Sequence, residues 1–250
     1  MPFSDYKTAL VTGASAGIGA AVVERLSSEG LKVHALARNA KALAALADRT
    51  GCIAHVLDVK DLAGITRLTQ AVEFDVLVNN AGVDRPNPFL KAEAGDIDLL
   101  IDVNLRAVLH LCRLVVPGMA ARDRGHVINI SSIAGAYNFG GNSTYHATKA
   151  AVSMLSRQLR IDCFGKRVRV TEVCPGRVAT DIFAHVHGDS AETHERFVRG
   201  FELPQPQDIA AAIGFAIAAP VAVNIGHIEI TPTLQVPGGL QTARPESAQL

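Results

Sequence analysis

Short apolar runs rich in β-forming residues alternate along this chain with longer segments of helical periodicity. The apolar runs are KTALVT, LKVHALA, CIAHVL, DVLVNN, GHVINIS, RVRVTEVC and GHIEI, at 7–12, 31–37, 52–57, 75–80, 125–131, 167–174 and 226–230. Between them, helical spacing covers 17–30, 40–49, 62–72, 97–121 and 143–164, and a last helix follows LPQPQD, where Asp208 is the expected cap. This order constrains the fold because parallel strands need long crossovers, which are usually helical.

The alternation predicts an α/β chain with one doubly wound (Rossmann) domain over residues 1–250. The domain has a seven-stranded parallel sheet with helices on both faces. No linker, low-complexity tract or short repeat divides the chain. Residues 180–206 break the alternation with mixed polar and aromatic residues, which predicts a mobile lid beyond the carboxyl end of a strand.

The charge balance points to a small-molecule partner. The chain has 250 residues with 24 basic and 24 acidic side chains, so no bulk field attracts nucleic acid or an anionic membrane. The N-terminus lacks a basic segment followed by an apolar core, and Pro220 interrupts the most apolar stretch, 209–223. We therefore expect a cytoplasmic protein that binds neither membrane nor nucleic acid.

The four cysteines are Cys52, Cys112, Cys163 and Cys174, and they show no CxxC spacing. Apolar neighbours favour reduced core thiols over disulfides or a zinc site. A ligand-rich composition also occurs in HVHGDSAETHE, which contains His185, His187, Asp189, His194 and Glu195. Its spacing fits no zinc template, so the sequence predicts no metal.

A glycine-rich turn, TGASAGIG, follows the first predicted strand and opens the first helix. Gly13, Gly17 and Gly19 permit a tight turn there and the close approach of a pyrophosphate to free amide groups at the helix N-terminus. The spacing differs from GxGxxG, and a turn without a ligand is the alternative interpretation. The strand and helix on either side favour a phosphate-binding loop.

The end of the second predicted strand bears on the choice of cofactor. An NAD(H) site would place a carboxylate near this point for the ribose 2′-hydroxyl, but the sequence there is Leu36-Ala37-Arg38-Asn39. A guanidinium at Arg38 would instead pair with a 2′-phosphate, which favours NADP(H) over NAD(H), although Arg38 is also a plausible solvated helix-start residue. Asp58, after the third strand, suits either adenine binding or capping of the next turn.

Six motifs in chain order resemble those of the short-chain dehydrogenase/reductase family. They are TGASAGIG, NNAG at 79–82, Asn104 in IDVNLR, Ser132 in NISSIAG, YHATK at 145–149 and PGRVAT at 175–180. The resemblance implies a catalytic set of Ser132, Tyr145, Lys149 and Asn104, with Asn104 holding a proton-relay water. Ser132 is preferred to its neighbour Ser131 because the family's serine lies thirteen positions before its tyrosine.

The same resemblance implies which residues contact the cofactor. They are Gly13, Ser15, Gly17, Ile18, Gly19, Arg38, Asp58, Val59, Asn80, Ala81, Gly82, Tyr145, Lys149, Pro175, Gly176, Val178 and Thr180. PGRVAT would close over the nicotinamide. Within the family, the likeness is to the branch of NADP-dependent 3-hydroxy acid dehydrogenases and clavulanate-type aldehyde reductases, through PQDIAAAI and HIEITPTLQV.

The residue types suit carbonyl reduction and its reverse. Hydride transfer to a carbonyl leaves an alkoxide that needs a proton, and a phenol with a pKa of about 10 is a weak acid near neutrality. We expect the ammonium of Lys149, one helical turn beyond Tyr145, to lower the phenol's pKa. Ser132 is expected to donate a hydrogen bond to the developing oxyanion.

The substrate is expected between Ser132, Tyr145 and the lid, and a small polar alcohol or carbonyl is predicted. Tyr137, Asn138 and Arg177 are further expected contacts, and Arg177 would clamp a carboxylate or sulfonate unless it pairs with a lid acid. Other wall candidates are Asp84, Arg85, Ile133, His146 and His185. Whether His146 faces the substrate or a neighbouring subunit is left open.

Two long predicted helices, 97–121 and 143–164, carry small and apolar residues on more than one face. These include Leu105, Val108, Leu109, Ala151 and Met154. One sheet cannot bury all of them, which together with the family resemblance predicts a homotetramer or homodimer.

Other functions on the same fold remain open at this point. The alternatives are a non-catalytic NAD(P)-binding regulator, an NAD-dependent dehydrogenase of a sugar alcohol or cyclic alcohol, and an epimerase or dehydratase without net redox change. The intact Ser132, Tyr145, Lys149 and Asn104 argue against a regulator, because sensing requires no proton relay.

Overall fold

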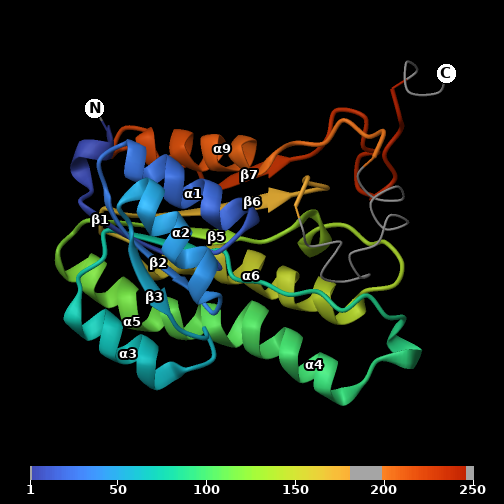
Figure 1. The fold of residues 1–250 in the computed structure, drawn as a ribbon, viewed down its shortest axis with the longest axis horizontal. Helices are drawn as coiled ribbons and strands as arrows, with labels where there is room; N and C mark the ends of the chain where they lie inside the picture. Colours follow the sequence, from blue (N-terminus) through green and yellow to red (C-terminus); the bar gives the residue numbers. More distant parts are fainter. Residues whose placement is uncertain (1, 181–198, 246–250) are drawn as a thin grey trace.

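The computed structural model describes residues 2–180 and 199–245, and its centre is a seven-stranded parallel sheet (Figure 1). The strands are β1 Thr8–Thr12, β2 Lys32–Ala37, β3 Ile53–Val56, β4 Val76–Asn79, β5 Gly125–Ile130, β6 Val168–Pro175 and β7 His227–Ile230. Their order across the sheet is β3-β2-β1-β4-β5-β6-β7, and every pair of neighbours is parallel. The sheet confirms the predicted fold class.

Helices cover both faces of this sheet, as predicted. The helices are α1 Gly17–Ser28, α2 Ala40–Thr50, α3 Leu62–Ala71, α4 Ala94–Ile101, α5 Ala107–Ala121, α6 Ser143–Asp162 and α9 Pro206–Ala218. In Figure 1, α1, α2 and α9 lie on one side of the strands, and α3, α4, α5 and α6 lie on the other. Short helical turns add η1 Pro2–Asp5, η2 Phe89–Lys91, η3 Asp102–Arg106 and η4 Ile133–Gly135.

The two layers enclose two separate apolar clusters. Val11 of β1 belongs to the cluster with Val22 of α1 and Ile213 of α9. Its neighbour Leu10 belongs to the other cluster, together with Leu111 of α5. Successive side chains of a strand point to opposite faces, so each central strand is buried on both sides.

The helix predicted at 97–121 is longer and interrupted. Helical structure runs from Ala94 through α4, the π-helical turn η3 and α5 to Ala121. Asn104 lies inside the π turn and is 1% exposed, so it is not a surface amide. Single π turns within α-helices often occur at functional sites.

The last helix starts two residues before the expected cap. α9 begins at Pro206 after Gln205, which places Asp208 at the third helical position. The Asp208 carboxylate still accepts a hydrogen bond from the backbone N–H of Gln205, at 2.7 Å. Asp208 therefore stabilises this helix end from within the first turn, and Pro206 occupies a position where no intrahelical N–H is required.

The direction in which successive strands are added to the sheet reverses at β1. The chain leaves β1 for β2 on one side, while β4 pairs with β1 on the other. At such a switch point the connections after neighbouring strands diverge, which leaves a crevice beyond their carboxyl ends. The glycine turn after β1 and the NNAG segment after β4 both border this crevice.

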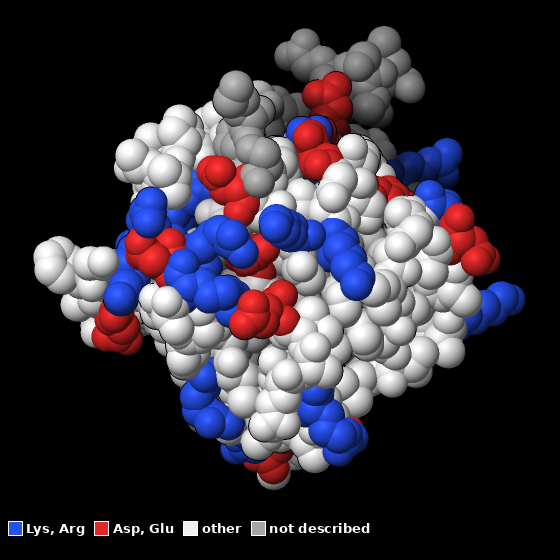
Figure 2. Space-filling view, turned by 90° about the vertical axis from the view of Figure 1, so that its left-hand side faces the viewer, with Lys and Arg blue, Asp and Glu red and all other residues white. Residues whose placement is uncertain are grey.

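The opposite, amino-terminal ends of the strands carry mixed charge. Asp75, just before β4, pairs with Arg124, just before β5, at 3.0 Å. Figure 2 shows the face on the left of Figure 1, and basic and acidic side chains are interspersed on it. Among the described residues, this face presents no extended patch of one sign.

The apolar residues of the two long helices divide between the core and the surface. Val108 is buried, whereas Leu109 and Met154 are 44% and 60% exposed. The predicted subunit contact at these helices remains a prediction. No described helix combines the length and the apolar character that crossing a bilayer requires.

The glycine turn is tightly packed. Gly13 and Gly17 have φ angles of 66° and 53°, in the left-handed region that favours glycine. A Cβ at Gly19 would collide with the carbonyl oxygen of Gly13 and lie 2.6 Å from Nδ2 of Asn80. Glycine at position 19 thus allows α1 to approach the loops that follow β1 and β4.

Replacing Gly19 with alanine should destabilise the protein. We expect Gly19→Ala to reduce the free energy of unfolding by about 1–3 kcal/mol, because the added methyl group forces backbone to move. The matched control is Gly95→Ala in α4, where a Cβ meets no atom within 4 Å. Chemical denaturation would measure both variants, and equal stability of the two would contradict the packing role of Gly19.

Candidate functional site

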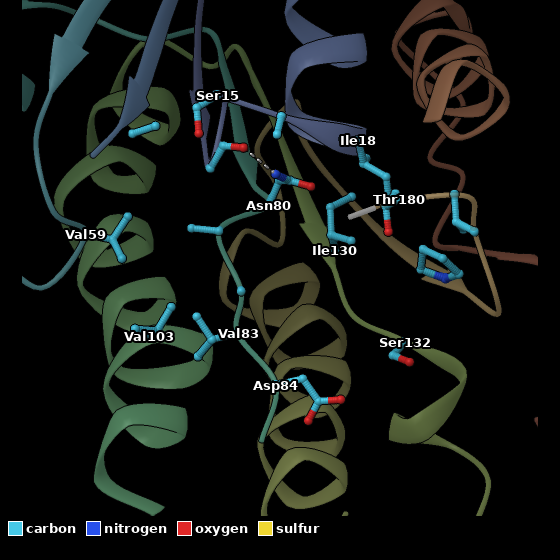
Figure 3. A pocket seen from close by; sticks show the side chains of 18 of the residues that line it. Ser15, Ile18, Val59, Asn80, Val83, Asp84, Val103, Ile130, Ser132 and Thr180 are labelled. Atoms are coloured by element: carbon cyan, nitrogen blue, oxygen red, sulfur yellow. Dashed lines mark hydrogen bonds between the residues drawn. The ribbon is translucent and has the colours of Figure 1, made fainter. Parts of the chain in front are cut away.

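A cavity of about 770 Å³ lies beyond the carboxyl ends of the strands. Loops after β1 to β6 contribute to its walls. Figure 3 looks into it, with Ser15 and Val59 toward one end and Asp84 and Ser132 toward the other. The two ends of the cavity are therefore lined by different side chains.

Hydrogen bonds join the two loops that form the centre of the cavity. The Asn80 side chain donates to the carbonyl oxygens of Thr12 and Gly13, at 3.0 and 3.3 Å. The Thr12 hydroxyl accepts from the backbone N–H groups of Asn80 and Ala81, each at 3.1 Å. NNAG is therefore held against the glycine turn.

One end of the cavity has the features expected for the adenosine side of a dinucleotide. Arg38 is exposed and lines the cavity without an ion-pair partner among the described residues. Asn39 caps α2 by accepting from the N–H of Ala42 at 3.1 Å. Asp58 accepts from the N–H of Lys60 at 2.9 Å and also lines the cavity, so it stabilises its turn and remains available for a ligand.

Tyr145 and Lys149 meet at the other end, on one face of α6. The Lys149 Nζ lies 5.5 Å from the centre of the Tyr145 ring and donates to the carbonyl oxygen of Ile130 at 2.9 Å. Burial lowers the pKa of Lys149 to about 8. The amino group of Lys149 thus lines the cavity and gains or loses its proton near neutral pH.

The pKa of Tyr145 differs from our expectation. Burial raises the pKa of this phenol, the negative charge of Asp84 raises it further, and a hydrogen bond with Ser132 acts in the opposite direction. The expected lowering of this pKa by Lys149 is not found, because the causes of the Tyr145 shift are burial, Asp84 and Ser132. Tyr145 is accordingly held as the neutral, proton-carrying phenol.

The two adjacent serines have different surroundings. Ser131 is 3% exposed, and its hydroxyl hydrogen bonds to the carbonyl oxygen of Lys149 at 3.0 Å and the hydroxyl of Ser153 at 3.1 Å. Ser132 is half-buried, and its Oγ accepts from the N–H of Ala134 at 3.1 Å. The Ser132 hydroxyl also hydrogen bonds with Tyr145, so these two side chains face the same end of the cavity.

Asn104 does not line the cavity but supports its wall. Its amide donates to the carbonyl oxygen of Val83 at 2.9 Å and accepts from the N–H of Val83 at 2.8 Å. A Cβ at Gly82 would lie 3.5 Å from Asn104 Oδ1 and 3.7 Å from Lys149 Nζ. Asn104 and Lys149 therefore border the same stretch of NNAG, and the Asn104 side chain holds the loop after it.

Most of the predicted cofactor residues line the cavity. Those that do are Gly13, Ser15, Gly17, Ile18, Arg38, Asp58, Val59, Asn80, Ala81, Gly82, Tyr145, Lys149, Pro175, Gly176, Val178 and Thr180. Gly19 does not, because it packs behind the turn. Sequence reasoning missed the apolar liners Leu57, Val83, Val103 and Ile130. Leu57 and Val83 directly adjoin residues that it identified, so extending the loops by one residue would have found them.

Arg177 lies outside the residues that line the cavity. It is 8% exposed, and its guanidinium stacks on the Phe201 ring at 4.5 Å from the ring centre. Its backbone N–H donates to Gln235 Oε1 at 3.1 Å. The expected position of Arg177 over the substrate is therefore not seen, since its side chain packs against the segment that returns to α9.

Tyr137 and Asn138 also lie outside the residues lining the cavity. A hydrogen bond to the Glu229 carboxylate raises the pKa of the Tyr137 phenol. The Tyr137 ring packs near Gly238, where an added Cβ would lie 3.3 Å from it. Asn138 is exposed. Tyr137 thus borders the C-terminal segment in this structure.

His146 has a structural environment. Its Nδ1 lies 2.7 Å from the carbonyl oxygen of Asn142, and its ring packs edge-on against Phe139 with centres 4.3 Å apart. Asn142 in turn donates to Asp84 at 2.6 Å. His146 is absent from the cavity lining, and hydrogen bonds connect it to Asp84 of that lining through Asn142.

The predicted lid falls mainly outside the described residues. Residues 181–198, which include His185, His187, Asp189, His194 and Glu195, are not described. The flanks of this segment meet, because the N–H of Ala179 donates to the carbonyl oxygen of Pro204 at 2.9 Å. Both flanks are thus placed at the cavity rim beside Thr180.

The sequence matches known proteins over nearly its full length. It is 38% identical to an uncharacterised short-chain dehydrogenase/reductase of Sinorhizobium fredii over 97% of this chain and 98% of that protein. It is also 38% identical to a Salmonella typhi protein named NADP-dependent 3-hydroxy acid dehydrogenase, over 94% of this chain and 98% of that one.

Solved structures are similar to this chain over nearly its full length as well. Serine dehydrogenase in its closed form with NADP+ superposes with a TM-score of 0.88 at 35% identity, over 95% of this chain and all of that one. A metagenomic short-chain oxidoreductase in complex with NADP superposes with a TM-score of 0.78 at 30% identity, over 94% and 100%.

The fold and the cavity define a Rossmann-type protein with a site for an elongated nucleotide-like ligand at the switch point of its sheet. The short chain dehydrogenase family matches residues 7–191. The chain therefore belongs to the short-chain dehydrogenase/reductase family of oxidoreductases.

Proposed function

We propose that this protein transfers a hydride between NADP(H) and a small polar alcohol or carbonyl compound. The observation that carries the proposal is the arrangement of one cavity. Ser132, Tyr145 and Lys149 line one end, while the glycine turn and Arg38 line the remainder. A reacting group and a dinucleotide would thus meet beside a proton donor.

The cavity fits NADP(H) by its donor groups. The turn after β1 precedes the N-terminus of α1, where free N–H groups suit a pyrophosphate. Arg38 offers a guanidinium to the 2′-phosphate, and no carboxylate replaces it at the end of β2. The relative named as an NADP-dependent dehydrogenase and the serine dehydrogenase structure with NADP+ support the same choice over NAD(H).

The bound nicotinamide supplies the hydride in reduction and accepts it in oxidation. Ser132 then holds the substrate oxygen by donating a hydrogen bond, and Tyr145 gives its phenolic proton to that oxygen as negative charge develops. The raised pKa of Tyr145 favours the protonated phenol, which suits the direction of carbonyl reduction. In alcohol oxidation, the phenolate must form first and accept the proton.

Lys149 and Asn104 complete the proposed relay. Lys149, with a pKa of about 8, can return a proton toward Tyr145 and stabilise the phenolate. The buried Asn104 fixes the loop at Val83 beside Lys149 and would position a water there. Protons would then pass between Lys149 and solvent through this water, without a second titrating side chain.

Besides Lys149, Asp84 and Arg85 are charged residues at the proposed substrate end of the cavity. Both line the cavity, and Arg85 also lies 3.5 Å from Asp96. Arg85 replaces Arg177 as our candidate for binding a substrate carboxylate. A 3-hydroxy acid fits this charge pattern, and an amino group on it would face Asp84.

A non-catalytic NAD(P)-binding regulator is the second candidate. A dehydrogenase of a sugar or cyclic alcohol that uses NAD(H) is a third. The buried Lys149 and the Tyr145 beside it argue against a regulator, because burying an amine costs free energy that binding alone does not require. Arg38 argues against NAD(H).

Tyr145→Phe should abolish most turnover. Loss of the phenol removes the proton donor, and we expect kcat to fall by at least about 100-fold. The assay is absorbance of reduced nicotinamide with a panel of 3-hydroxy acids, neutral alcohols, aldehydes and ketones. Tyr137→Phe is the matched control and should retain near wild-type kcat, because its hydroxyl meets Glu229. Wild-type turnover in Tyr145→Phe would refute the mechanism, whereas tight cofactor binding by the wild type without turnover would favour the regulator.

Arg38→Ala should weaken the binding of NADP(H) much more than the binding of NAD(H). We expect the KM for NADPH to rise about 10- to 100-fold, since a charge-assisted bond to the 2′-phosphate is lost, with little change for NADH. Arg49→Ala, which removes a surface guanidinium paired with Glu24, serves as the control. An equal effect of Arg38→Ala on both cofactors would contradict the assignment.

Asp84→Asn should shift the pH profile of alcohol oxidation toward lower pH. The Asp84 charge raises the pKa of Tyr145, so neutralising it lowers that pKa and the phenolate forms earlier. We expect the rising limb of kcat to move by roughly half a unit to one unit. Asp98→Asn, an exposed change on α4, is the control. If the pH dependence of kcat is unchanged in Asp84→Asn, the Asp84 charge does not set the pKa of Tyr145.

A further inference from the structure

Glu172, Cys174 and His227 bring three kinds of metal ligand together outside the cavity. One ligand atom from each residue lies within 4.8 Å of the other two. Glu172 and Cys174 are buried at 1% exposure each, and the His227 side chain is 45% exposed. The cluster therefore opens toward solvent on the imidazole side only.

The sheet fixes these residues in place. Glu172 and Cys174 are two positions apart on β6, so their side chains leave the same face of the strand. His227 is the register partner of Glu172 on the neighbouring strand β7. Backbone pairing thus holds all three side chains without help from any loop, which is the rigidity that a metal site needs.

The separations approach those of a tetrahedral site, with Cys174 and His227 facing different oxygens of the Glu172 carboxylate. The Cys174 Sγ lies 3.1 Å from Glu172 Oε1 and 3.9 Å from His227 Nδ1. The Glu172 Oε2 lies 3.3 Å from His227 Nδ1. Zinc bonds of ordinary length at tetrahedral angles would place such ligand pairs about 3.4–3.6 Å apart. Shifts of a few tenths of an ångström would seat the ion, and a water on the exposed side would be the fourth ligand.

The charge of the cluster also favours a cation. Glu172 accepts hydrogen bonds from Ser153 and Cys174, which are neutral donors. In the part of the chain that the structure describes, its recorded ion-pair partner is His227. A buried carboxylate normally requires a lasting positive partner, and a divalent ion would supply one.

A supporting shell is present around the carboxylate. Ser153 on α6 donates to Glu172 and also contacts the Ser131 hydroxyl at 3.1 Å. Hydrogen bonds of this kind orient ligands in natural metal sites. Ser153 is therefore a positioning residue for the cluster.

We propose that Glu172, Cys174 and His227 form a binding site for Zn²⁺ or a similar divalent transition metal. The inference departs from the sequence expectation of no metal, which rested on cysteine spacing and the lid histidines. On binding, the Cys174 Sγ–H bond breaks, its proton passes to solvent, and the thiolate binds the ion. The ion would tie the edge strand β7 to β6 just before Pro175 and Gly176, which line the cavity.

Titration of the full-length protein with Zn²⁺ after chelator treatment tests the site. We expect one Zn²⁺ bound per chain by calorimetry, with affinity reduced at least about 10-fold in Cys174→Ser and in His227→Gln. The exposed position of His227 makes His227→Gln the variant that preserves folding best. Ser153→Ala should weaken binding by a smaller factor, since it removes orientation and no ligand.

Cobalt provides a readout that binding strength alone cannot. Co²⁺ bound at this site should give a near-ultraviolet sulfur-to-metal charge-transfer band, because one ligand is a thiolate. The band should disappear in Cys174→Ser and persist in two controls, Cys163→Ser and His110→Gln. Circular dichroism of each variant confirms that loss of the band is not loss of fold.

Three results would overturn the proposal. The first is no stoichiometric Zn²⁺ binding by the wild-type protein. The second is wild-type affinity in folded His227→Gln and Cys174→Ser. The third is loss of binding in a double variant of His185 and His187 while both cluster variants still bind, which would place the metal on the lid segment.

Discussion

The hydrogen bonds between Thr12 and Asn80 join the ends of β1 and β4, and the geometry of the whole cavity depends on them. These bonds are 3.0 and 3.1 Å long, and further bonds from Asn80 to Gly13 and from Ala81 to Thr12, at 3.3 and 3.1 Å, hold the same two loops together. Gly19 permits this approach because any side chain there would strike Gly13 and Asn80. The remaining walls follow from strand order, since each other loop leaves a neighbouring strand at the same edge of the sheet.

At the end of the cavity that holds Tyr145 and Lys149, burial is the dominant effect on ionisation. Tyr145 and Lys149 are shifted toward their neutral forms by the loss of water, and nearby charges modify this. Asp84 raises the pKa of both residues, which makes the loop after β4 part of the electrostatics of the site. Asn104 reaches the same loop through Val83 from the π turn between α4 and α5. The proposed proton relay and the proposed substrate wall are thus connected through one segment.

The accuracy of sequence-based prediction differed between local and distant features. The strands and helices followed from periodicity, and the cavity residues from motifs that sit directly after strands. The predicted start of α9 was two residues late because an aspartate can stabilise a helix end from the third helical position as well as from the N-cap. The contacts of Arg177 were not readable from PGRVAT for a different reason: its neighbours Phe201 and Gln235 are distant in sequence.

The sequence by itself determined the fold class, the family resemblance and the spacing of Tyr145 and Lys149, because each depends on residues close together in the chain. Only the tertiary structure decided that Asn104 holds Val83, that burial keeps Tyr145 protonated, and that Glu172 and Cys174 meet His227. The last of these contacts joins residues 53 positions apart. Such contacts depend on strand order and register, which place side chains by packing and hydrogen bonding across the whole sheet.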